Sequence, residues 1–289
     1  MPLEDGFADV AVIMPAYKAE ATIARALGSV AAQTVKPREV VVVDDGSPDG
    51  TSAAVEAMMG AMNGIDLKLF RQDNAGAGAA RNRALKEATA TWVAFLDADD
   101  EWLPAKIERS MAVLEAGNYT LVAHDYEENR DGVKTHAECA RRFMAAGDDP
   151  LGELYRRGYI DTCSVVTERE AVLAVGGFDA TLPVGQDFDL ILKVLERDGA
   201  TFTVFPDPLV RYYITPGSIT SNTDRRLACQ MRILLRHAPA LKRGRLRSVL
   251  FRTLAVHKEA LDAHRMHGRW GGVVRTLIKL PFNLLRGLL

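Results

Sequence analysis

Residues 92–100 read WVAFLDADD, and the rest of the sequence is interpreted outward from this stretch. Its first five residues are mostly apolar, which predicts a short buried strand at 92–96. Three carboxylates follow, Asp97, Asp99 and Asp100, and burying them without partners would cost several kcal/mol each. A divalent cation that prefers oxygen ligands, Mg²⁺ or Mn²⁺, would compensate such a cluster. Asp97 and Asp99 therefore suggest a metal ion bound together with a nucleotide diphosphate.

The same residues have a second interpretation. The acidic run could form a solvated turn that caps a helix beginning near Pro104. An Asp-x-Asp pattern alone does not separate the two interpretations.

The chain upstream favours the metal. Apolar runs predict strands at 10–14, 39–43, 67–70 and 92–96, with helices between them. Such alternation predicts a parallel sheet covered on both faces, which binds ligands beyond the carboxyl ends of its strands. The unusual polar residues gather at those ends: Tyr17, Asp44 and Asp45, a loop with Gly76 and Gly78, and the run 97–100.

Two of these features have alternatives. Gly76 and Gly78 could make a tight connection, or they could let the backbone approach a ligand while Arg81 donates to a phosphate or a base edge. Tyr17 could lie at the edge of the core, or it could stack on a base. The residues alone leave both pairs open.

Beyond Pro104 the alternation is less regular. The patterns predict a helix to Glu115, a hairpin or loop at 125–134, a helical excursion at 139–160, a helix at 168–175, and strands at 120–124, 163–166, 201–205 and 209–213. A further helix opens at Gln186 and carries Asp187 in its first turn. Asp187 would be a helix cap worth about 1 kcal/mol, or a proton acceptor at the mouth of a cleft.

The composition is that of an ordinary soluble globular protein. The chain has 289 residues, 48% hydrophobic and 26% charged, enough for one large domain or two small ones. Cys139, Cys163 and Cys229 form no C-x-x-C pair, which indicates a reduced compartment and structural roles. The first residues lack the order of a signal peptide, and no apolar run is long enough to span a bilayer.

Charge is divided sharply along the chain. Residues 1–221 carry 21 Lys+Arg against 35 Asp+Glu, whereas residues 222–289 carry 15 against 3. The segment 242–247, KRGRLR, is the densest basic part. Near the end, large apolar residues would line one side of a helix, namely Val274, Leu277, Ile278, Leu284, Leu285 and Leu288, with Arg275, Lys279 and Arg286 on another. Pro281 predicts a kink or an interruption there.

Three interpretations of this basic tail stay open. It could bind an anionic membrane surface, or it could dock on the acidic body or on another copy of the chain. Nucleic acid is disfavoured because few aromatic residues are interleaved with the cations, so we expect no nucleic-acid partner.

Together these segments resemble the inverting GT-A glycosyltransferases of family 2. The matching segments are VIMPAY (12–17), VDDGSPDGT (43–51), NAGAGAARN (74–82), FLDADD (95–100), GGFD (176–179) and QDFDL (186–190). The resemblance implies an α/β fold of GT-A type, with a mostly parallel central sheet flanked by helices. It also implies a catalytic domain at 1–221, with a nucleotide half at 8–104 and an acceptor half at 105–221, followed by a basic helical tail at 222–289.

The resemblance implies roles for single residues. Asp187 would be the general base, Asp99 together with Asp97 would hold Mg²⁺ or Mn²⁺, and Asp45 or Asp44 would bind the edge of the base. Nucleotide contacts are implied for Pro15, Ala16, Tyr17, Glu20, Asp44, Asp45, Asn74, Gly76, Arg81, Asp97 and Ala98. Trp102, Gly177, Phe178, Asp179 and Gln186 would lie on the acceptor side.

Two positions depart from the pattern of many relatives. Gln186 stands where a Glu often precedes the aspartate at 187. Thr215, at the end of YYIT (212–215), stands where a histidine often binds the metal or the diphosphate.

The function implied is metal-dependent, inverting transfer of a sugar from a nucleoside-diphosphate donor, with UDP favoured, to a hydroxyl acceptor. A lipid-linked or polysaccharide precursor at the inner face of the cell membrane would suit the tail, which implies a cytoplasmic, peripheral enzyme. Gln186 and Thr215 keep a silent nucleotide-sugar sensor or scaffold as an alternative. A sugar nucleotidyltransferase is disfavoured, since residues 15–17 are not a glycine-rich basic loop.

Overall fold

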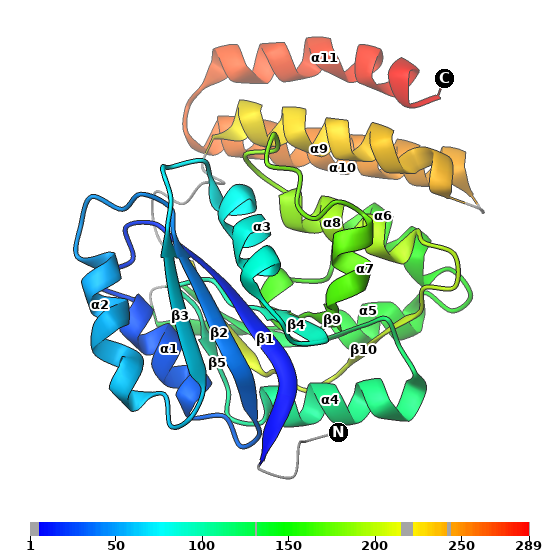
Figure 1. Cartoon of the computed structure of the whole chain (residues 1–289). Helices are drawn as coiled ribbons and strands as arrows, with labels where there is room; N and C mark the ends of the chain where they lie inside the picture. Colours follow the sequence, from blue (N-terminus) through cyan, green and yellow to red (C-terminus); the bar gives the residue numbers. More distant parts are fainter. Residues whose placement is uncertain (1–5, 131, 215–221, 242–243, 289) are drawn as a thin grey trace.

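The computed structural model describes residues 6–130, 132–214, 222–241 and 244–288, and its centre is a seven-stranded sheet (Figure 1). In spatial order the strands are β10 (Phe202–Phe205), β6 (Leu121–His124), β9 (Val166–Glu168), β4 (Trp92–Phe95), β1 (Phe7–Ala16), β2 (Lys36–Asp44) and β3 (Asp66–Arg71). Every strand except β9 runs in the same direction, because only β9 pairs antiparallel with its two neighbours. The expected mostly parallel sheet is therefore confirmed.

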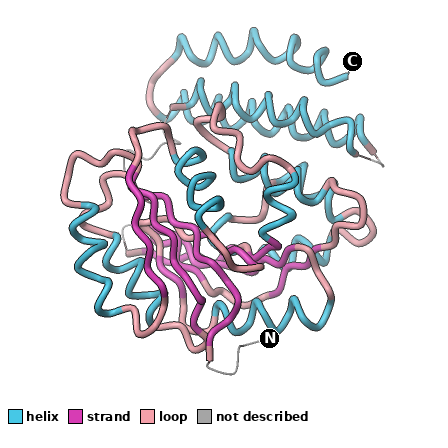
Figure 2. Tube along the Cα trace, viewed as in Figure 1, coloured by secondary structure: helices cyan, strands magenta, loops and turns pink. Residues whose placement is uncertain are grey.

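The valine run of β2 shows why the sheet is buried on both sides. Val41 and Val43 point into one core, and Val40 and Val42 point into the other, as the two-residue period of a strand requires. The first core is covered by α3 (Ala77–Glu87), α7 (Arg169–Ala174) and α8 (Gln186–Leu195), and the second by α1 (Ile23–Ala31), α2 (Thr51–Met58) and α4 (Lys106–Gly117). A 3₁₀ turn at Met59–Ala61 follows α2. Figure 2 shows the strands lying between these helices.

A smaller sheet of four strands borders the first. It contains β5 (Glu101–Trp102), β11 (Val210–Tyr213), β7 (Tyr126–Arg130) and β8 (Val133–Ala137), in that order. β7 and β8 form the hairpin that the charged run at 125–134 predicts. The excursion at 139–160 consists of two short helices, α5 (Cys139–Ala145) and α6 (Pro150–Arg157), the second capped by the side chain of Asp149.

One predicted strand begins in the wrong place. The apolar run at 163–166 predicts a strand, but residues Thr162–Ser164 form a 3₁₀ turn and β9 begins only at Val166. The Asp161 carboxylate accepts a hydrogen bond from the Cys163 backbone N–H at 2.8 Å. This local side-chain bond favours a turn over the extended ladder that the apolar run alone predicts.

The basic tail folds into three helices stacked over one end of the body (Figure 1). They are α9 (Thr223–His237), α10 (Arg245–Met266) and α11 (Trp270–Leu288), with a 3₁₀ turn at Ala238–Ala240 after α9. Of the kink or interruption expected at Pro281, the interruption does not occur, because α11 continues through it. Pro281 is exposed, so water can satisfy the carbonyl that loses its amide partner. Among the described residues no helix is both apolar and long enough to cross a bilayer. The catalytic-domain boundary expected at residue 221 lies outside the described residues, as do the predicted positions Thr215, Lys242 and Arg243, and the Leu288 side chain is not described.

α9 is joined to the body by buried ion pairs. Asp189 of α8 is fully buried and contacts Arg236 at 2.7 Å, the His237 ring at 3.0 Å and Lys193 at 2.8 Å. The other ring nitrogen of His237 lies 2.8 Å from Glu196. This part of the tail therefore docks on the acidic body, as one of the three sequence interpretations proposes.

The junction predicts a pH-dependent contribution of His237 to stability. Burial lowers the pKa of His237, but hydrogen bonds to Asp189 and Glu196 outweigh it and raise the pKa above the ordinary 6.5. The stabilisation is therefore complete below that value and is lost as the pH rises through the folded pKa. His237→Leu should lower the free energy of unfolding by about 3 kcal/mol near pH 6, because it leaves buried carboxylates short of a partner.

Urea unfolding of the wild type and His237→Leu at several pH values measures this effect. The difference between the two proteins should shrink as the pH rises. His267→Leu is the matched control, since His267 is exposed and bonds only a backbone carbonyl of its own helix. A difference that stays constant with pH would contradict the assignment.

Candidate active site

The carboxyl ends of β1, β2, β3 and β4 meet at one edge of the sheet. In the parallel register Ala16 lies beside Asp44, and Asp44 beside Arg71, while β4 ends beside Ile13. The segments following these strands therefore approach one another, and they contain most of the nucleotide-contact residues that the sequence predicts. The structure places Pro15, Ala16, Tyr17, Glu20, Asp44, Asp45, Asn74, Gly76, Arg81, Asp97 and Ala98 on this edge or on the segments that leave it.

Hydrogen bonds hold the segment after β1 against the segment after β2. The Asp45 N–H donates to the Ala16 carbonyl at 2.8 Å, and the Ala19 N–H donates to the Thr51 hydroxyl at 2.8 Å. Glu20 accepts a bond from the Gly50 N–H at 3.0 Å. Tyr17 between them is 48% exposed. An exposed ring held at the end of a strand can stack on a base.

Asp45 organises the glycine loop. Its buried carboxylate accepts the backbone N–H of Ala75 at 2.9 Å and of Gly76 at 2.7 Å, and the Gln72 amide at 2.8 Å. The Asn74 amide donates to the Asp45 carbonyl at 2.9 Å. Gly76 has a φ of +91°, which glycine adopts without strain. Asp45 therefore holds the loop through its carboxylate, and its contact with a base stays a prediction.

The Asp44 carboxylate likewise accepts hydrogen bonds from within the protein. This buried carboxylate accepts the Ser47 N–H at 2.9 Å and also the Ser52 hydroxyl. Arg71 donates to that same hydroxyl at 2.7 Å. Asp44 thus fixes the turn between β2 and α2.

The acidic segment after β4 surrounds a buried arginine. Arg81 of α3 is 5% exposed, and it donates to the Asp97 carboxylate at 2.5 Å and lies over the Phe178 ring at 5.3 Å. Burial opposes the charge of Arg81, yet the carboxylates of Asp97 and Asp187 raise its pKa. The charge of Arg81 is therefore stabilised by carboxylates from two parts of the chain, the segment after β4 and the start of α8.

Asp187 is not the cap of its helix. The capping residue of α8 is Gly185, and the Asp187 carboxylate instead accepts the Thr162 hydroxyl at 3.1 Å and the Phe188 N–H at 2.8 Å. The carboxylate is half-buried, so part of it remains accessible. Between the two sequence interpretations, this geometry is compatible with the proton acceptor.

Three further carboxylates have raised pKa values. Burial and the charge of Asp97 raise the pKa of Asp99, and they raise the pKa of Asp100 well above its ordinary value. Burial raises the pKa of Asp161 to about 7, helped by Asp187 and Asp97 and opposed by the bond from Cys163. The site therefore holds more negative charge than Arg81 can balance.

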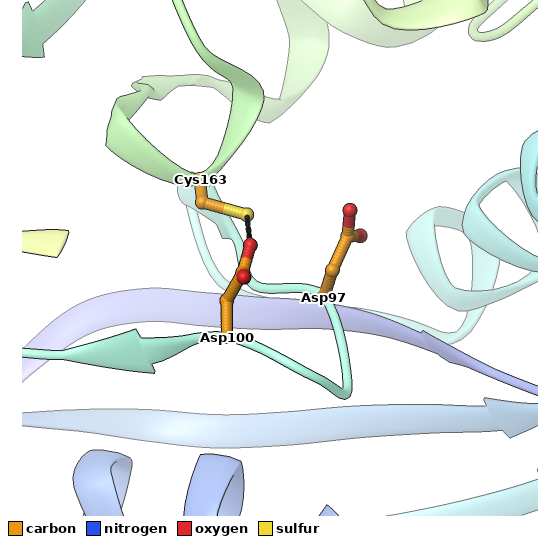
Figure 3. A group of neighbouring side chains, drawn as sticks. All are labelled: Asp97, Asp100 and Cys163. Atoms are coloured by element: carbon orange, nitrogen blue, oxygen red, sulfur yellow. Dashed lines mark hydrogen bonds between the residues drawn. The ribbon is translucent and has the colours of Figure 1, made fainter. Parts of the chain in front are cut away.

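Asp97, Asp100 and Cys163 offer one ligand atom each within 4.8 Å of one another (Figure 3). Asp100 is fully buried and accepts the Tyr213 N–H at 2.9 Å and the Cys163 S–H at 3.2 Å. Burial and the neighbouring carboxylates raise the pKa of Cys163 well above its ordinary value, so it is held as a thiol. The two carboxylates fit Mg²⁺ or Mn²⁺, and the thiol supports Asp100.

Asp99 does not join this group. Its backbone carbonyl accepts a bond from Arg25 at 2.5 Å, and its carboxylate is half-buried. Two sets of metal ligands are therefore to be compared: Asp97 with Asp99, as the sequence predicts, and Asp97 with Asp100, as the geometry groups them.

The residues expected on the acceptor side are mostly buried. Trp102 is 2% exposed and donates from its indole nitrogen to the Cys163 carbonyl at 3.2 Å, and Phe178 is 3% exposed beneath Arg81. A Cβ on Gly177 would lie 2.4 Å from the Asn82 side chain, so close packing requires glycine there. These three residues are packed inside the protein next to the site, and their expected place on the acceptor side stays a prediction.

Asp179 and Gln186 have different surroundings. Asp179 contacts Arg236 at 2.7 Å and Arg232 at 3.3 Å, both on α9. Gln186 is 8% exposed and packs against Gly78 at the start of α3. Contact of either residue with an acceptor stays a prediction.

Sequence reasoning missed four residues of the cluster: Asp161, Thr162, Cys163 and Tyr212. Burial, followed by Asp161, Asp100 and Asp97, raises the pKa of the Tyr212 phenol, so that side chain also lies near the carboxylates. The available signal was Asp161, an acidic residue directly before an apolar run, where a side chain commonly caps a turn.

Comparison with known proteins agrees with this geometry. The family model of glycosyl transferase family 2 matches residues 11–166, more than half of the chain. This chain belongs to glycosyl transferase family 2. The resemblance drawn from the motifs is thereby confirmed, and with it the expectation of an enzyme.

Relatives of this family 2 chain include UDP-Glc:alpha-D-GlcNAc-diphosphoundecaprenol beta-1,3-glucosyltransferase WfgD of Escherichia coli. The two are 29% identical over 226 residues, which is 78% of this chain and 85% of WfgD.

Two solved structures show the same fold. TarS of S. aureus with UDP-GlcNAc has a TM-score of 0.70 at 20% identity, over 95% of this chain and 81% of that one. The mannosyltransferase PcManGT of Pyrobaculum calidifontis, in complex with GDP-Man and Mn²⁺, has a TM-score of 0.64 at 20% identity, over 97% and 86%. The predicted GT-A fold is confirmed by this similarity.

The bonds to Asp45 predict its importance for the glycine loop. Asp45→Asn replaces one carboxylate oxygen by an amide nitrogen that cannot accept, so only one of the N–H groups of Ala75 and Gly76 keeps its acceptor. The free energy of unfolding should fall by about 2 kcal/mol, and the amide of Gly76 should exchange its hydrogen faster. Asp73→Asn, at an exposed neighbour in the same loop, should change neither quantity. Equal effects of the two substitutions would contradict this role.

Proposed function

We propose that this protein is a metal-dependent inverting glycosyltransferase. It transfers a sugar from a nucleoside-diphosphate donor, with UDP favoured, to a hydroxyl group of a lipid-linked or polysaccharide precursor. The observation that carries the proposal is the surroundings of buried Arg81, which donates to the Asp97 carboxylate and has its pKa raised by the charge of Asp187, so a second carboxylate lies near the edge of the sheet. The donor named for WfgD and the UDP-GlcNAc bound to TarS support a UDP-sugar.

The nucleotide lies, in this proposal, along the segments that follow β1, β2 and β3. Tyr17 stacks on the base, while Asp45 keeps the loop at Asn74 and Gly76 in place for close approach. Ala98, buried beside the acidic segment, leaves room for the ribose next to Asp97.

Asp97 holds the metal together with Asp100 or Asp99. A bound Mg²⁺ or Mn²⁺ supplies a Lewis acid for the charge that develops on the departing diphosphate. The protein fixes Asp97 by the Arg81 pair and Asp100 by the Tyr213 N–H. The Mn²⁺ in the PcManGT structure supports a cation at this kind of site.

Asp187 is the general base. As the acceptor oxygen forms its bond to the anomeric carbon, the bond from that carbon to the diphosphate breaks, and the hydroxyl proton passes to the Asp187 carboxylate. A single displacement of this kind inverts the anomeric centre. Thr162 orients the carboxylate from the side away from solvent.

The acceptor is proposed to be lipid-linked, because WfgD is named for a diphosphoundecaprenol-linked acceptor. The enzyme would then act as a peripheral protein at the inner face of the cell membrane. An excess of cations in residues 222–289, 15 against 3 acidic residues, suits that surface.

The base assignment predicts a selective loss of turnover. Asp187→Asn should lower the rate of sugar transfer from a UDP-sugar by about 10²–10⁴-fold while UDP affinity is retained, since only proton removal is affected. Transfer to a diphosphoundecaprenol-linked acceptor and calorimetric binding of UDP measure the two quantities. Asp198→Asn, at an exposed carboxylate after α8, should change neither. Full activity in Asp187→Asn would refute the assignment, and UDP binding without transfer in the wild type would favour a sensor or scaffold.

The metal assignment predicts an order of Mn²⁺ affinities in the presence of UDP. Asp97→Asn and Asp100→Asn should each weaken Mn²⁺ binding by about tenfold or more, because each removes a charged oxygen ligand. Cys163→Ser should keep the affinity, since a hydroxyl can still donate to Asp100. Titration calorimetry compares these variants with Asp99→Asn. Loss in Asp99→Asn but not in Asp100→Asn would reinstate the pair predicted from the sequence.

A further inference from the structure

Helix α11 lies outermost in the molecule (Figure 1). It exposes a row of large apolar side chains. Six of them are each at least 50% exposed: Trp270, Val274, Leu277, Ile278, Phe282 and Leu285. Successive members are three or four residues apart, except the adjacent Leu277 and Ile278, and this pattern places them on one side of the helix. This row includes four of the positions that the sequence pattern singles out and extends them with Trp270 and Phe282. A continuous apolar face of this kind marks an interaction surface.

The inner side of α11 carries small residues instead. A Cβ on Gly272 would lie 2.4 Å from the His264 ring of α10, and one on Gly287 would lie 2.7 Å from Val249. Thr276 between them is buried and bonds the Gly272 carbonyl. Small residues of α11 therefore face α10 and allow close packing, whereas the large apolar residues of α11 face away from the protein. Packing within the chain does not account for that choice.

Cations border the apolar row on one side. Arg275, Lys279 and Arg286 recur at intervals of four and seven residues, and all three are exposed. Arg275 pairs with Asp224 of α9 at 3.2 Å. Within the described residues, Lys279 and Arg286 have no ion-pair partner closer than 4.0 Å. Two cations are therefore free to bind an external anion.

A groove of about 750 Å³ lies between α9 and α11 next to these cations. Its lining combines apolar and basic side chains, among them Leu227, Met231, Arg232, Lys279 and Arg286. This mixture fits the phosphate and the adjoining glycerol of a lipid better than it fits a purely apolar ligand.

We propose that the outer face of α11 docks on an anionic phospholipid bilayer. The apolar row enters the boundary between headgroups and acyl chains, and Lys279 and Arg286 bind lipid phosphates at the groove. A second copy of the chain fits this face less well, because two tails with 15 cations and 3 acidic residues each would repel one another. The inference rests on the proposed membrane location, and it is independent of the transfer reaction.

Ion pairs between α9 and α8 fix the orientation of the tail relative to the rest of the protein. They tie the tail to the catalytic half, so a docked α11 would hold that half at a fixed distance from the bilayer. Figure 1 shows the loop that enters α3, at the carboxyl edge of the sheet, on the side of the molecule that carries the tail. A membrane-bound acceptor would therefore approach the edge where the donor site lies.

Co-sedimentation of the full chain with vesicles tests the proposal. One set contains phosphatidylcholine alone, and the other contains equal parts of phosphatidylcholine and phosphatidylglycerol. The protein should bind the anionic vesicles, and binding should weaken as salt is added. The double variant Lys279→Gln, Arg286→Gln should bind about thirtyfold more weakly, as expected for two lost cations near an anionic surface.

The apolar row is tested by the triple variant Leu277→Ser, Ile278→Ser, Phe282→Ser. It should lose vesicle binding and still unfold at the wild-type urea concentration, because these side chains are exposed. Val133→Ser with Met144→Ser removes two equally exposed apolar residues from the body and should leave binding unchanged.

Fluorescence of Trp270 and a solution mass measurement complete the test. The emission should shift to shorter wavelength on anionic vesicles, and the shift should vanish in Trp270→Phe. Equal binding by wild type and triple variant would overturn the proposal. So would a wild-type dimer that ignores vesicles and dissociates in the triple variant. UDP binding, measured in the same variants, should stay unchanged, so a failure of docking is distinguishable from a failure of the proposed transferase.

Discussion

The mutual repulsion of carboxylates at the end of β4 is the constraint on which the rest of the structure depends. Burial and the charges of Asp97 and Asp161 raise the pKa of Asp100, and burial together with the charges of Asp187 and Asp97 raises the pKa of Asp161. One buried cation, Arg81, balances only part of this negative charge. Such a cluster is tolerable because its members accept hydrogen bonds from fixed donors, and because a divalent ion can complete it. A divalent cation, bound as proposed above, would balance the remaining negative charge of this cluster.

Pairing of opposite charges also governs the contact between the tail and the body. Asp179 and Asp189 are acidic residues of the body, and Arg232, Arg236 and His237 of α9 pair with them. The negative excess of the first 221 residues and the positive excess of the remainder therefore meet partly inside the molecule. Lys279 and Arg286 of α11 stay exposed and are positively charged. The uneven distribution of charge along the chain therefore serves folding and, in the proposed docking, binding to an anionic surface.

Much of the fold follows from local patterns. The valines of β2 form a strand buried on two faces because every second side chain enters a different core. The nucleotide edge follows as well, because the carboxyl ends of parallel strands meet wherever the sheet forms. These are properties of period and direction, which a single sequence contains.

The missing parts depend on contacts between distant segments. Asp161 and Cys163 join the cluster only because a 3₁₀ turn brings them beside Asp100, which is 61 and 63 positions away. Phe178 lies in the GGFD motif and Trp102 two residues after FLDADD, yet the depth at which their side chains lie depends on packing that the motifs do not encode. The same holds for α11, whose small inner residues are informative only once α10 is known to lie against them.

Asp187 and Asp189 stand two residues apart on α8, and their partners connect the chemistry to the tail. Asp187 is oriented by Thr162, from the turn before β9, whereas Asp189 is held by Arg236 and His237 of α9. Because a helix turn is rigid, the ion pairs that dock the tail also fix the direction in which Asp187 points. A general base must stay within hydrogen-bond reach of the hydroxyl that it deprotonates. The tail therefore helps to position the helix that carries Asp187. Without the tail, α8 would lose its ion pairs with Arg236 and His237.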